Sequence, residues 1–352
     1  MCAANCSQAS EENQIKRILG CLYGQAIGDA MGMPSELWSK RQIVEYFGWI
    51  DSFLPGPKEN IAASEFQAGE FTDDTSQAVA LMKAIGEAGG QINPLVIANH
   101  IMAWAKSINA FEKNILGPTS KATLTAIAQG VPLDEISANG VTNGAAMRVS
   151  PIGCLLTCED KARFIEQVRL SCLATHKSDI AIAGAAVIAW AISRAIDGAT
   201  WCEIKPELVA IANDTQQQYE STFSPLLGNR IAYALGVVAD SASQELGLTR
   251  LYEDVGCGMD MIESIPSVIG LVELAQTHPM RCAELAANLG GDTDTIGAMA
   301  TAICGALHGV DAFNPADIAL INRVNHIDFR PYSQMLSEYR QSSINVKGNH
   351  HV

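Results

Sequence analysis

Apolar residues recur at helical spacing along most of this chain, and that periodicity limits the possible folds more than any other feature. Alanine, leucine and isoleucine return every three or four positions, whereas few stretches alternate as strands do. The clearest predicted helices cover residues 14–27, 76–87, 94–106, 121–129, 178–196 and 280–289. The sequence therefore predicts an all-α fold.

Glycine, proline and asparagine gather at short breaks between these helices. The breaks lie near residues 54–57, 88–90, 116–118, 130–132 and 139–140. None is long or polar enough to be a flexible linker, and no repeat of about 20 to 50 residues is present. We therefore expect one compact multi-helix domain over residues 14–341, with flexible termini at 1–13 and 342–352.

The charge balance and the apolar runs exclude two classes of partner. The 23 basic and 38 acidic residues give a net charge of -15, which is opposite to the basic surface that a nucleic-acid backbone needs. The longest apolar runs, 181–192 and 296–307, are shorter than the roughly 20 residues that span a bilayer. We expect both to be buried core helices, and neither nucleic acid nor membrane to be a partner.

The cysteines and the first residues indicate a cytoplasmic protein. The ten cysteines lack the paired spacing of a zinc site, so we expect reduced thiols buried as small apolar side chains. Residues 1–12 are polar and acidic, unlike the basic and apolar start of a secretory signal.

Two threonine- and aspartate-rich motifs each open a predicted helix. They are Thr72-Asp73-Asp74-Thr75 and Asp292-Thr293-Asp294-Thr295. Threonine and aspartate are favoured at helix starts, so each motif alone can be read as a cap. Four carboxylates brought together in an apolar helical protein would instead need cations, and oxygen ligands suit magnesium, manganese or calcium. The spacing leaves both readings open.

Small residues and one acid mark the segment near the N-terminus. Gly20, Gly24 and Gly28 recur every four positions, which lets a second helix approach closely, so we interpret them as packing residues. Glu36 follows the proline at the end of this segment. It is either a solvated loop acid or a residue with a chemical role.

A glycine-rich loop and a single histidine are further candidates. The loop contains Asn143 and Gly144 and can be a plain turn or can direct backbone amides toward an anion; Arg148, just after it, is equally ambiguous. His176 precedes an apolar helix, where a structural role and a ligand role are both open.

Read in order, these segments resemble the ADP-ribosylglycohydrolase family, which includes the dinitrogenase-reductase-activating glycohydrolase and the metal-dependent vertebrate ADP-ribosylhydrolases. The likeness runs through residues 20–36, 69–75, 143–151, 175–176 and 288–309. It implies an all-helical domain with two Mg²⁺ or Mn²⁺ ions at its centre. The implied metal ligands are Thr72, Asp73, Asp74, Asp292, Asp294 and Thr295.

The resemblance also implies catalytic and substrate-binding positions. Proton transfer falls to Glu36 or to one of the acids Asp73, Asp74 and Asp292. Two loops look like those that cradle a diphosphate in this family. One histidine looks like the family's histidine that lines the distal ribose. These positions are Gly117, Thr119, Ser120, Asn143, Gly144, Ala145, Met147 and His176. Lys177, where many relatives have proline, and the pair Ala145-Ala146 depart from the family pattern.

The function implied is a glycosidase that removes ADP-ribose from a modified protein side chain or an ADP-ribosyl conjugate. Cations that orient the distal ribose hydroxyls and activate water would serve hydrolysis through an oxocarbenium-like transition state. Two alternatives stay open, namely hydrolysis of a small ribosylated molecule such as a nucleoside, and a non-catalytic structural member of the fold. The clustered acids argue against the second.

Overall fold

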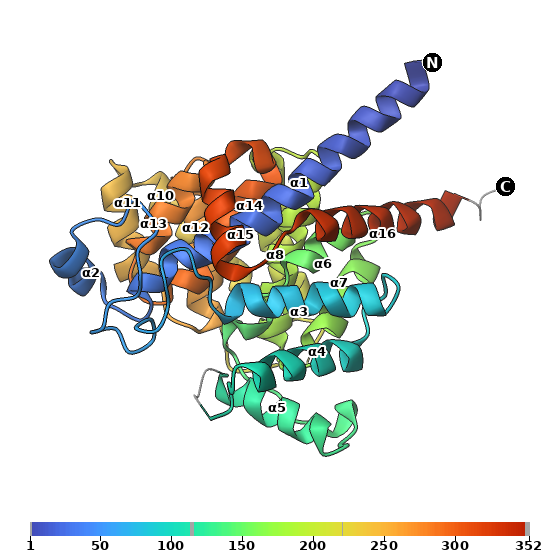
Figure 1. Ribbon diagram of the computed structural model, residues 1–352, viewed down its shortest axis with the longest axis horizontal. Coiled ribbons are helices and arrows are strands. Elements are labelled where there is room, and N and C mark those ends of the chain that lie inside the picture. Colours follow the sequence, from blue (N-terminus) through green and yellow to red (C-terminus); the bar gives the residue numbers. More distant parts are fainter. Residues whose placement is uncertain (1, 113–115, 220, 349–352) are drawn as a thin grey trace.

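The computed structural model describes residues 2–112, 116–219 and 221–348, and helices are its main secondary structure (Figure 1). Within these ranges no strand forms, and two isolated bridges are the β-type pairings found. The α-helices are α1 (Cys2–Gly32), α2 (Lys40–Phe47), α3 (Asp73–Glu87), α4 (Pro94–Ser107), α5 (Pro118–Ala128), α6 (Ser150–Leu155), α7 (Lys161–Cys172), α8 (Asp179–Ile196), α9 (Trp201–Gln216), α10 (Leu227–Ala239), α11 (Gln244–Arg250), α12 (Met261–Leu274), α13 (Pro279–Ala287), α14 (Thr293–His308), α15 (Pro315–Asn325) and α16 (Arg330–Gly348). The short helical turns are η1 (Met33–Ser35), η2 (Leu133–Glu135), η3 (Asn143–Ala145), η4 (Leu251–Val255) and η5 (Val310–Ala312). The all-α prediction is confirmed.

Helices α1 and α14 pack antiparallel through backbone contacts at the centre of the fold. A Cβ built at Gly28 would lie 2.1 Å from the carbonyl oxygen of Gly297, and one at Gly20 would lie 2.4 Å from that of Gly305. Only residues without a side chain permit such an approach. The predicted packing role of these glycines is confirmed, and it brings the ends of two motif-bearing helices together.

Helix α8 is the buried apolar helix at the core. It is long and apolar enough to cross a membrane by length and composition, yet 94% of that stretch is buried inside the fold. It packs against α6, α9, α12 and α14. The prediction of a core helix is therefore confirmed for this segment.

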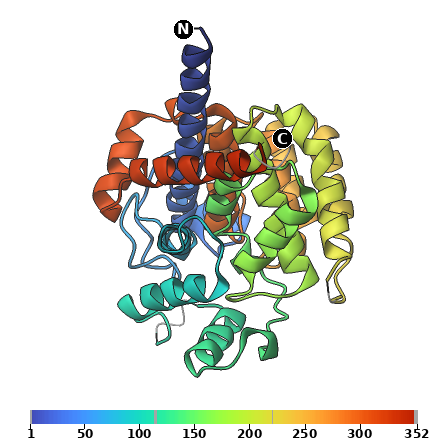
Figure 2. The same ribbon diagram turned by 90° about the vertical axis from the view of Figure 1, so that its right-hand side faces the viewer.

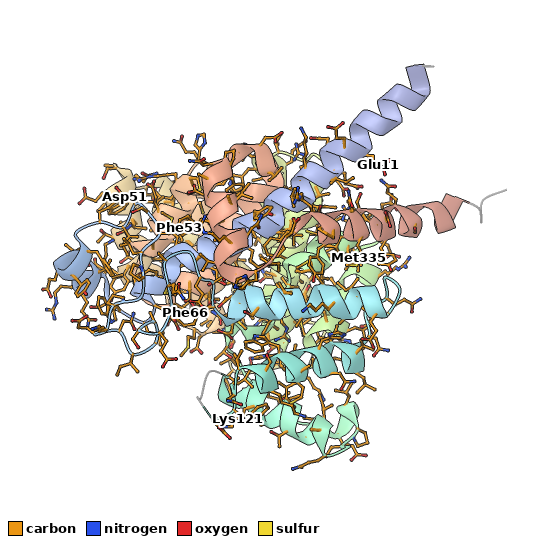
Figure 3. All side chains as sticks on the ribbon, in the orientation of Figure 1. Glu11, Asp51, Phe53, Phe66, Lys121 and Met335 are labelled. Carbon is orange, nitrogen blue, oxygen red and sulfur yellow. The ribbon has the colours of Figure 1, made fainter. Side chains whose placement is uncertain are left out.

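The layer formed by α3, α4 and α5 lies on one side of the bundle, where Figure 1 shows the three helices one beside another. On the opposite side the N-terminal part of α1 extends beyond the body, as Figure 2 shows. Glu11 lies on this extension and is exposed (Figure 3).

The predicted domain boundaries fall inside helices. The boundary after residue 13 lies within α1 and the one after residue 341 lies within α16. Both boundaries, and the flexibility of the termini, stay predictions. Residues 349–352 of the predicted tail lie outside the described residues.

Candidate metal centre and adjoining loops

The two acidic motifs open α3 and α14 at the same place in the fold. The Thr72 hydroxyl donates to Asp74 Oδ2 at 3.0 Å and lies 3.3 Å from Asp294 Oδ2, so one side chain links both helix starts. Thr72 and Asp292 occupy the two N-cap positions, and neither side chain bonds the amides of its own helix. The motifs are therefore not built as helix caps.

Asp29 of α1 caps the start of α3 in place of the motif residues. Its Oδ1 accepts from the Thr72 amide at 2.9 Å, and its Oδ2 accepts from the amide and hydroxyl of Thr75 at 3.0 and 2.6 Å. Sequence reasoning gave Asp29 no role, although it is an acid among the small and apolar residues of a buried helix. An acid in such an apolar segment was the sequence feature that could have identified Asp29 as a functional or structural residue.

Three buried carboxylates converge at this point. Oxygens of Asp29, Asp74 and Asp294 lie within 4.8 Å of one another. Among the described residues, Asp74 Oδ1 and Asp294 Oδ1 are buried without any hydrogen-bond partner. Both Asp29 oxygens already accept bonds, so Asp74 and Asp294 are the better ligand candidates. Unpaired buried carboxylate oxygens are costly, and an oxygen-only donor set fits a hard divalent cation.

Burial and mutual repulsion shift these acids toward their protonated forms. Burial and the charge of Asp29 raise the pKa of Asp73 to about 7. Burial, Glu36 and Asp74 raise the pKa of Asp294 well above its usual range. Without a cation the centre therefore holds protons near neutral pH, and a cation would replace them.

Glu36 lies beside the second motif because a short bridge holds it there. The Leu37 amide donates to the Gly291 carbonyl at 2.8 Å, and Asn60 Nδ2 donates to the Glu36 carbonyl at 2.9 Å. Burial, followed by the charges of Asp292 and Asp73, raises the pKa of Glu36 to about 8. This environment differs from that of a solvated loop acid.

The predicted substrate loops meet next to this centre. Asn143 Nδ2 donates to Asp292 Oδ2 at 2.6 Å, which ties η3 to the start of α14. A Cβ at Gly140 would lie 2.2 Å from Thr119 Oγ1, so the start of α5 packs closely on the same loop. Ser178 Oγ donates to the Gly140 carbonyl at 2.8 Å and brings the start of α8 to this place.

Most side chains of these loops are turned inward. Ser120, Ala145 and Met147 are buried, so any contact that they make with a ligand would use the backbone. Lys177 Nζ donates to the carbonyls of Leu133 and Ile136, which fixes the η2 segment. The lysine that departs from the family pattern thus has a structural task.

Arg148 and His176 form a buried network behind the loop. Arg148 donates to Gln77 Oε1 at 3.1 Å, to the Gly144 carbonyl at 2.8 Å and to Thr175 Oγ1 at 2.5 Å. His176 is 1% exposed, and both ring nitrogens have partners. Its contact with a ribose stays a prediction.

A cavity of about 470 Å³ lies between α3, α4 and the α15–α16 segment. Ser76, Lys83, His100, Trp104 and Tyr332 are among its lining residues. None of the predicted site residues lines it, so the clustered acids, and not this cavity, define the candidate site.

Comparison with known proteins identifies the family of this chain. Residues 10–341 match the family model described as ADP-ribosylglycohydrolase. The chain is 58% identical to the Escherichia coli (strain K12) protein YegU, over 93% of this chain and 98% of that protein. It is 26% identical to the ADP-ribosylhydrolase ARH3 of Bos taurus, over 88% and 90% of the two chains. A solved structure titled ADP-ribosylglycohydrolase-related protein complex has a similar fold, with a TM-score of 0.68, 21% identity and coverage of 94% and 99%.

Proposed function

This chain belongs to the ADP-ribosylglycohydrolase family, and on that premise we propose that it is a metal-dependent hydrolase that releases ADP-ribose from a modified protein side chain or a small ADP-ribosyl conjugate. The observation that carries the proposal is the pair of buried, unpartnered oxygens of Asp74 and Asp294 where two motif helices begin. Buried acids with raised pKa values in such a cluster are typical of functional sites.

The donor set for cations comes from both motifs. It consists of Thr72, Asp73, Asp74, Asp292, Asp294 and Thr295. Two divalent cations, Mg²⁺ or Mn²⁺, would supply positive charge for the distal ribose hydroxyls and Lewis acidity for the attacking water. Asn143 fixes the orientation of the Asp292 carboxylate through its 2.6 Å hydrogen bond, and Asp29 fixes the start of α3.

Glu36 is the residue that handles the proton in this proposal. In the cation-free protein burial and the neighbouring acids raise its pKa to about 8, so this carboxyl group holds a proton more readily than an ordinary glutamate. It can give that proton to the leaving atom as the glycosidic bond breaks and then accept one from the water. The carboxylates around it stabilise positive charge that develops at the anomeric carbon.

The phosphates are bound by neutral donors in this proposal. Gly117 begins α5 without a side-chain cap, which leaves amides of the first turn, near Thr119 and Ser120, available to an anion. The Asn143–Met147 segment adds a second stretch of backbone beside the acids. Such binding suits a chain with a net charge of -15.

The test is a panel of substrates with Mg²⁺ or Mn²⁺. Arginine-, serine- and O-acetyl-linked ADP-ribose and ribonucleosides are supplied, and release of ADP-ribose or ribose is measured. We expect release from at least one ADP-ribosyl compound, and its loss with a chelator. Release from ribonucleosides alone would favour the small-molecule alternative, and absence of both turnover and calorimetric cation binding would contradict the proposal.

A further inference from the structure

One loop segment is linked to both acidic motifs of the candidate centre. Asn143 Nδ2 donates to Asp292 Oδ2 of the second motif at 2.6 Å. At the other end of this segment Arg148 Nη1 donates to Gln77 Oε1 at 3.1 Å, and Gln77 Nε2 donates to Asp73 Oδ2 of the first motif at 2.9 Å. The segment from Asn143 to Arg148 is therefore bonded to Asp292 directly and to Asp73 through Gln77.

The orientation of the Gln77 amide follows from its two neighbours. An arginine side chain only donates, so the Gln77 atom that faces Arg148 is the carbonyl oxygen. The amide nitrogen therefore faces Asp73 and donates to its carboxylate. Flipping the amide would set its nitrogen against the guanidinium and its oxygen against an ionised carboxylate, so both bonds would be lost.

Arg148 holds the glutamine in this orientation because its own side chain is fixed. Its Nη1 also donates to the Gly144 carbonyl at 2.8 Å, and its Nη2 donates to Thr175 Oγ1 at 2.5 Å. Arg148 and Gln77 are each 1% exposed, so water does not compete for these bonds. Burial lowers the pKa of Arg148 only to about 10, and the side chain stays charged near neutral pH. A buried positive charge thus faces Asp73 across one amide.

An amide is suited to orient a carboxylate that must bind a cation. A donor fixed on one oxygen sets the rotation of the carboxylate, and partners of this kind tune the affinity of metal sites. A lysine or arginine in direct contact would also neutralise the acid and so compete with the cation, whereas a neutral amide does not. Each acidic motif has one acid held in this way, Asp73 by Gln77 and Asp292 by Asn143.

We propose that Gln77 is a positioning residue of the metal centre, which orients the Asp73 carboxylate for a divalent cation and is itself held in place by Arg148. This inference rests on the proposed function, in which Asp73 is a cation ligand. Gln77 lies one turn after Asp73 on α3, so the bond stays within the helix that carries the first motif. The bond from Arg148 then connects this helix to the loop that orients Asp292.

Calorimetry of the cation-free protein with Mg²⁺ or Mn²⁺ tests this role. Gln77→Met keeps the length of the side chain and removes both hydrogen bonds of the amide, and it should raise the Kd for the cation about 10- to 100-fold. Gln77→Asn, whose shorter amide cannot bridge Arg148 and Asp73, should change the Kd in the same direction. For an ADP-ribosyl substrate, kcat/KM of Gln77→Met should fall at subsaturating Mg²⁺ and recover when Mg²⁺ is raised.

The matched control is Gln216→Met in α9. Gln216 is also a buried glutamine with both ends of its amide bonded, since Nε2 donates to the Pro225 carbonyl at 3.1 Å and Oε1 accepts from the Leu227 amide at 2.9 Å. Helix α9 packs against α8 and α10. Gln216→Met should therefore lose a similar amount of stability in urea unfolding with a chelator present, and it should keep the wild-type Kd for the cation.

The outcomes separate this inference from the proposed function. Wild-type protein that binds no cation would overturn both. Wild-type protein that binds the cation, with an unchanged Kd for Gln77→Met and Gln77→Asn, would overturn the inference alone. An equal loss of cation affinity in Gln216→Met would also overturn it, because the loss would then come from stability and not from the orientation of Asp73.

Discussion

At the scale of single residues, the acids of the centre divide into those already paired and those that are not. Asp29 has both oxygens occupied by the start of α3, and Asp292 accepts from Asn143. Asp74 and Asp294 each keep one buried oxygen without a described partner. The paired acids hold the geometry, and the unpaired ones gain most from a cation.

Replacing Asp294 by asparagine tests this division. We expect Asp294→Asn to weaken Mg²⁺ or Mn²⁺ binding by roughly 10- to 100-fold and to lower turnover by about 10² or more. The cation-free variant should melt at the same or a higher temperature than wild type, since the substitution removes a buried carboxyl group that repels its acidic neighbours whenever it ionises. Calorimetry and thermal unfolding measure the two effects.

The matched control for that variant is Asp311→Asn. Asp311 forms an exposed ion pair with Lys16 at 2.9 Å, far from the motifs in the fold. This change should leave cation affinity and turnover as in wild type. If Asp294→Asn instead lowers the melting temperature and keeps full cation affinity, the acid is structural.

At the scale of elements, the contact of α1 with α14 sets the separation of the acids that these helices carry. The contact is made by backbone, because glycines on both helices face each other. A side chain at this surface has no room, and the helices can separate only by moving Asp29 away from Asp294.

Gly28→Ala should therefore destabilise the fold. Its Cβ would meet the Gly297 carbonyl at 2.1 Å, and overpacking of this kind costs about 1–3 kcal/mol. Gly236→Ala in α10 is the control, since nothing lies within 4 Å of its Cβ and helix propensity should stabilise it by about 0.5–1 kcal/mol. Urea unfolding of both variants measures the difference, and equal stability of the two would contradict this account.

The sequence predicted helices better than it predicted contacts between them. The segment 94–106 became α4 (Pro94–Ser107) and 178–196 became α8 (Asp179–Ile196), because local periodicity and end residues mark such helices. The role of Asp29 was missed. Its partner Thr72 is distant in the chain, and spacing holds no information on which distant segments meet.

At the scale of the whole molecule, the buried acids link stability to pH and to cations. In the folded cation-free protein the pKa is about 6 for Asp29, about 7 for Asp73 and about 8 for Glu36. Unfolded carboxyl groups titrate near ~4. Between these values the folded state binds more protons than the unfolded state, so its stability is lost as pH rises.

We expect the free energy of unfolding to fall from pH 6 to pH 8.5 when a chelator is present. With saturating Mg²⁺ or Mn²⁺ the fall should shrink or reverse, because cations bind the deprotonated acids of the folded state. Urea unfolding at the two pH values, with and without cation, measures this. A chelated protein that gains stability over this interval would contradict the raised pKa values.

The separation of the helical centre from the loops beside it has a consequence for protein engineering. Asp29 and Asp294 lie on α1 and α14, which pack backbone to backbone, whereas Thr142 and His176 lie on segments joined by a side-chain hydrogen bond. Libraries confined to residues 117–120 and 140–142 could therefore alter which conjugate is accepted while the catalytic core is inherited unchanged. Selection for a new substrate specificity can therefore start from this chain with the acidic centre left as it is.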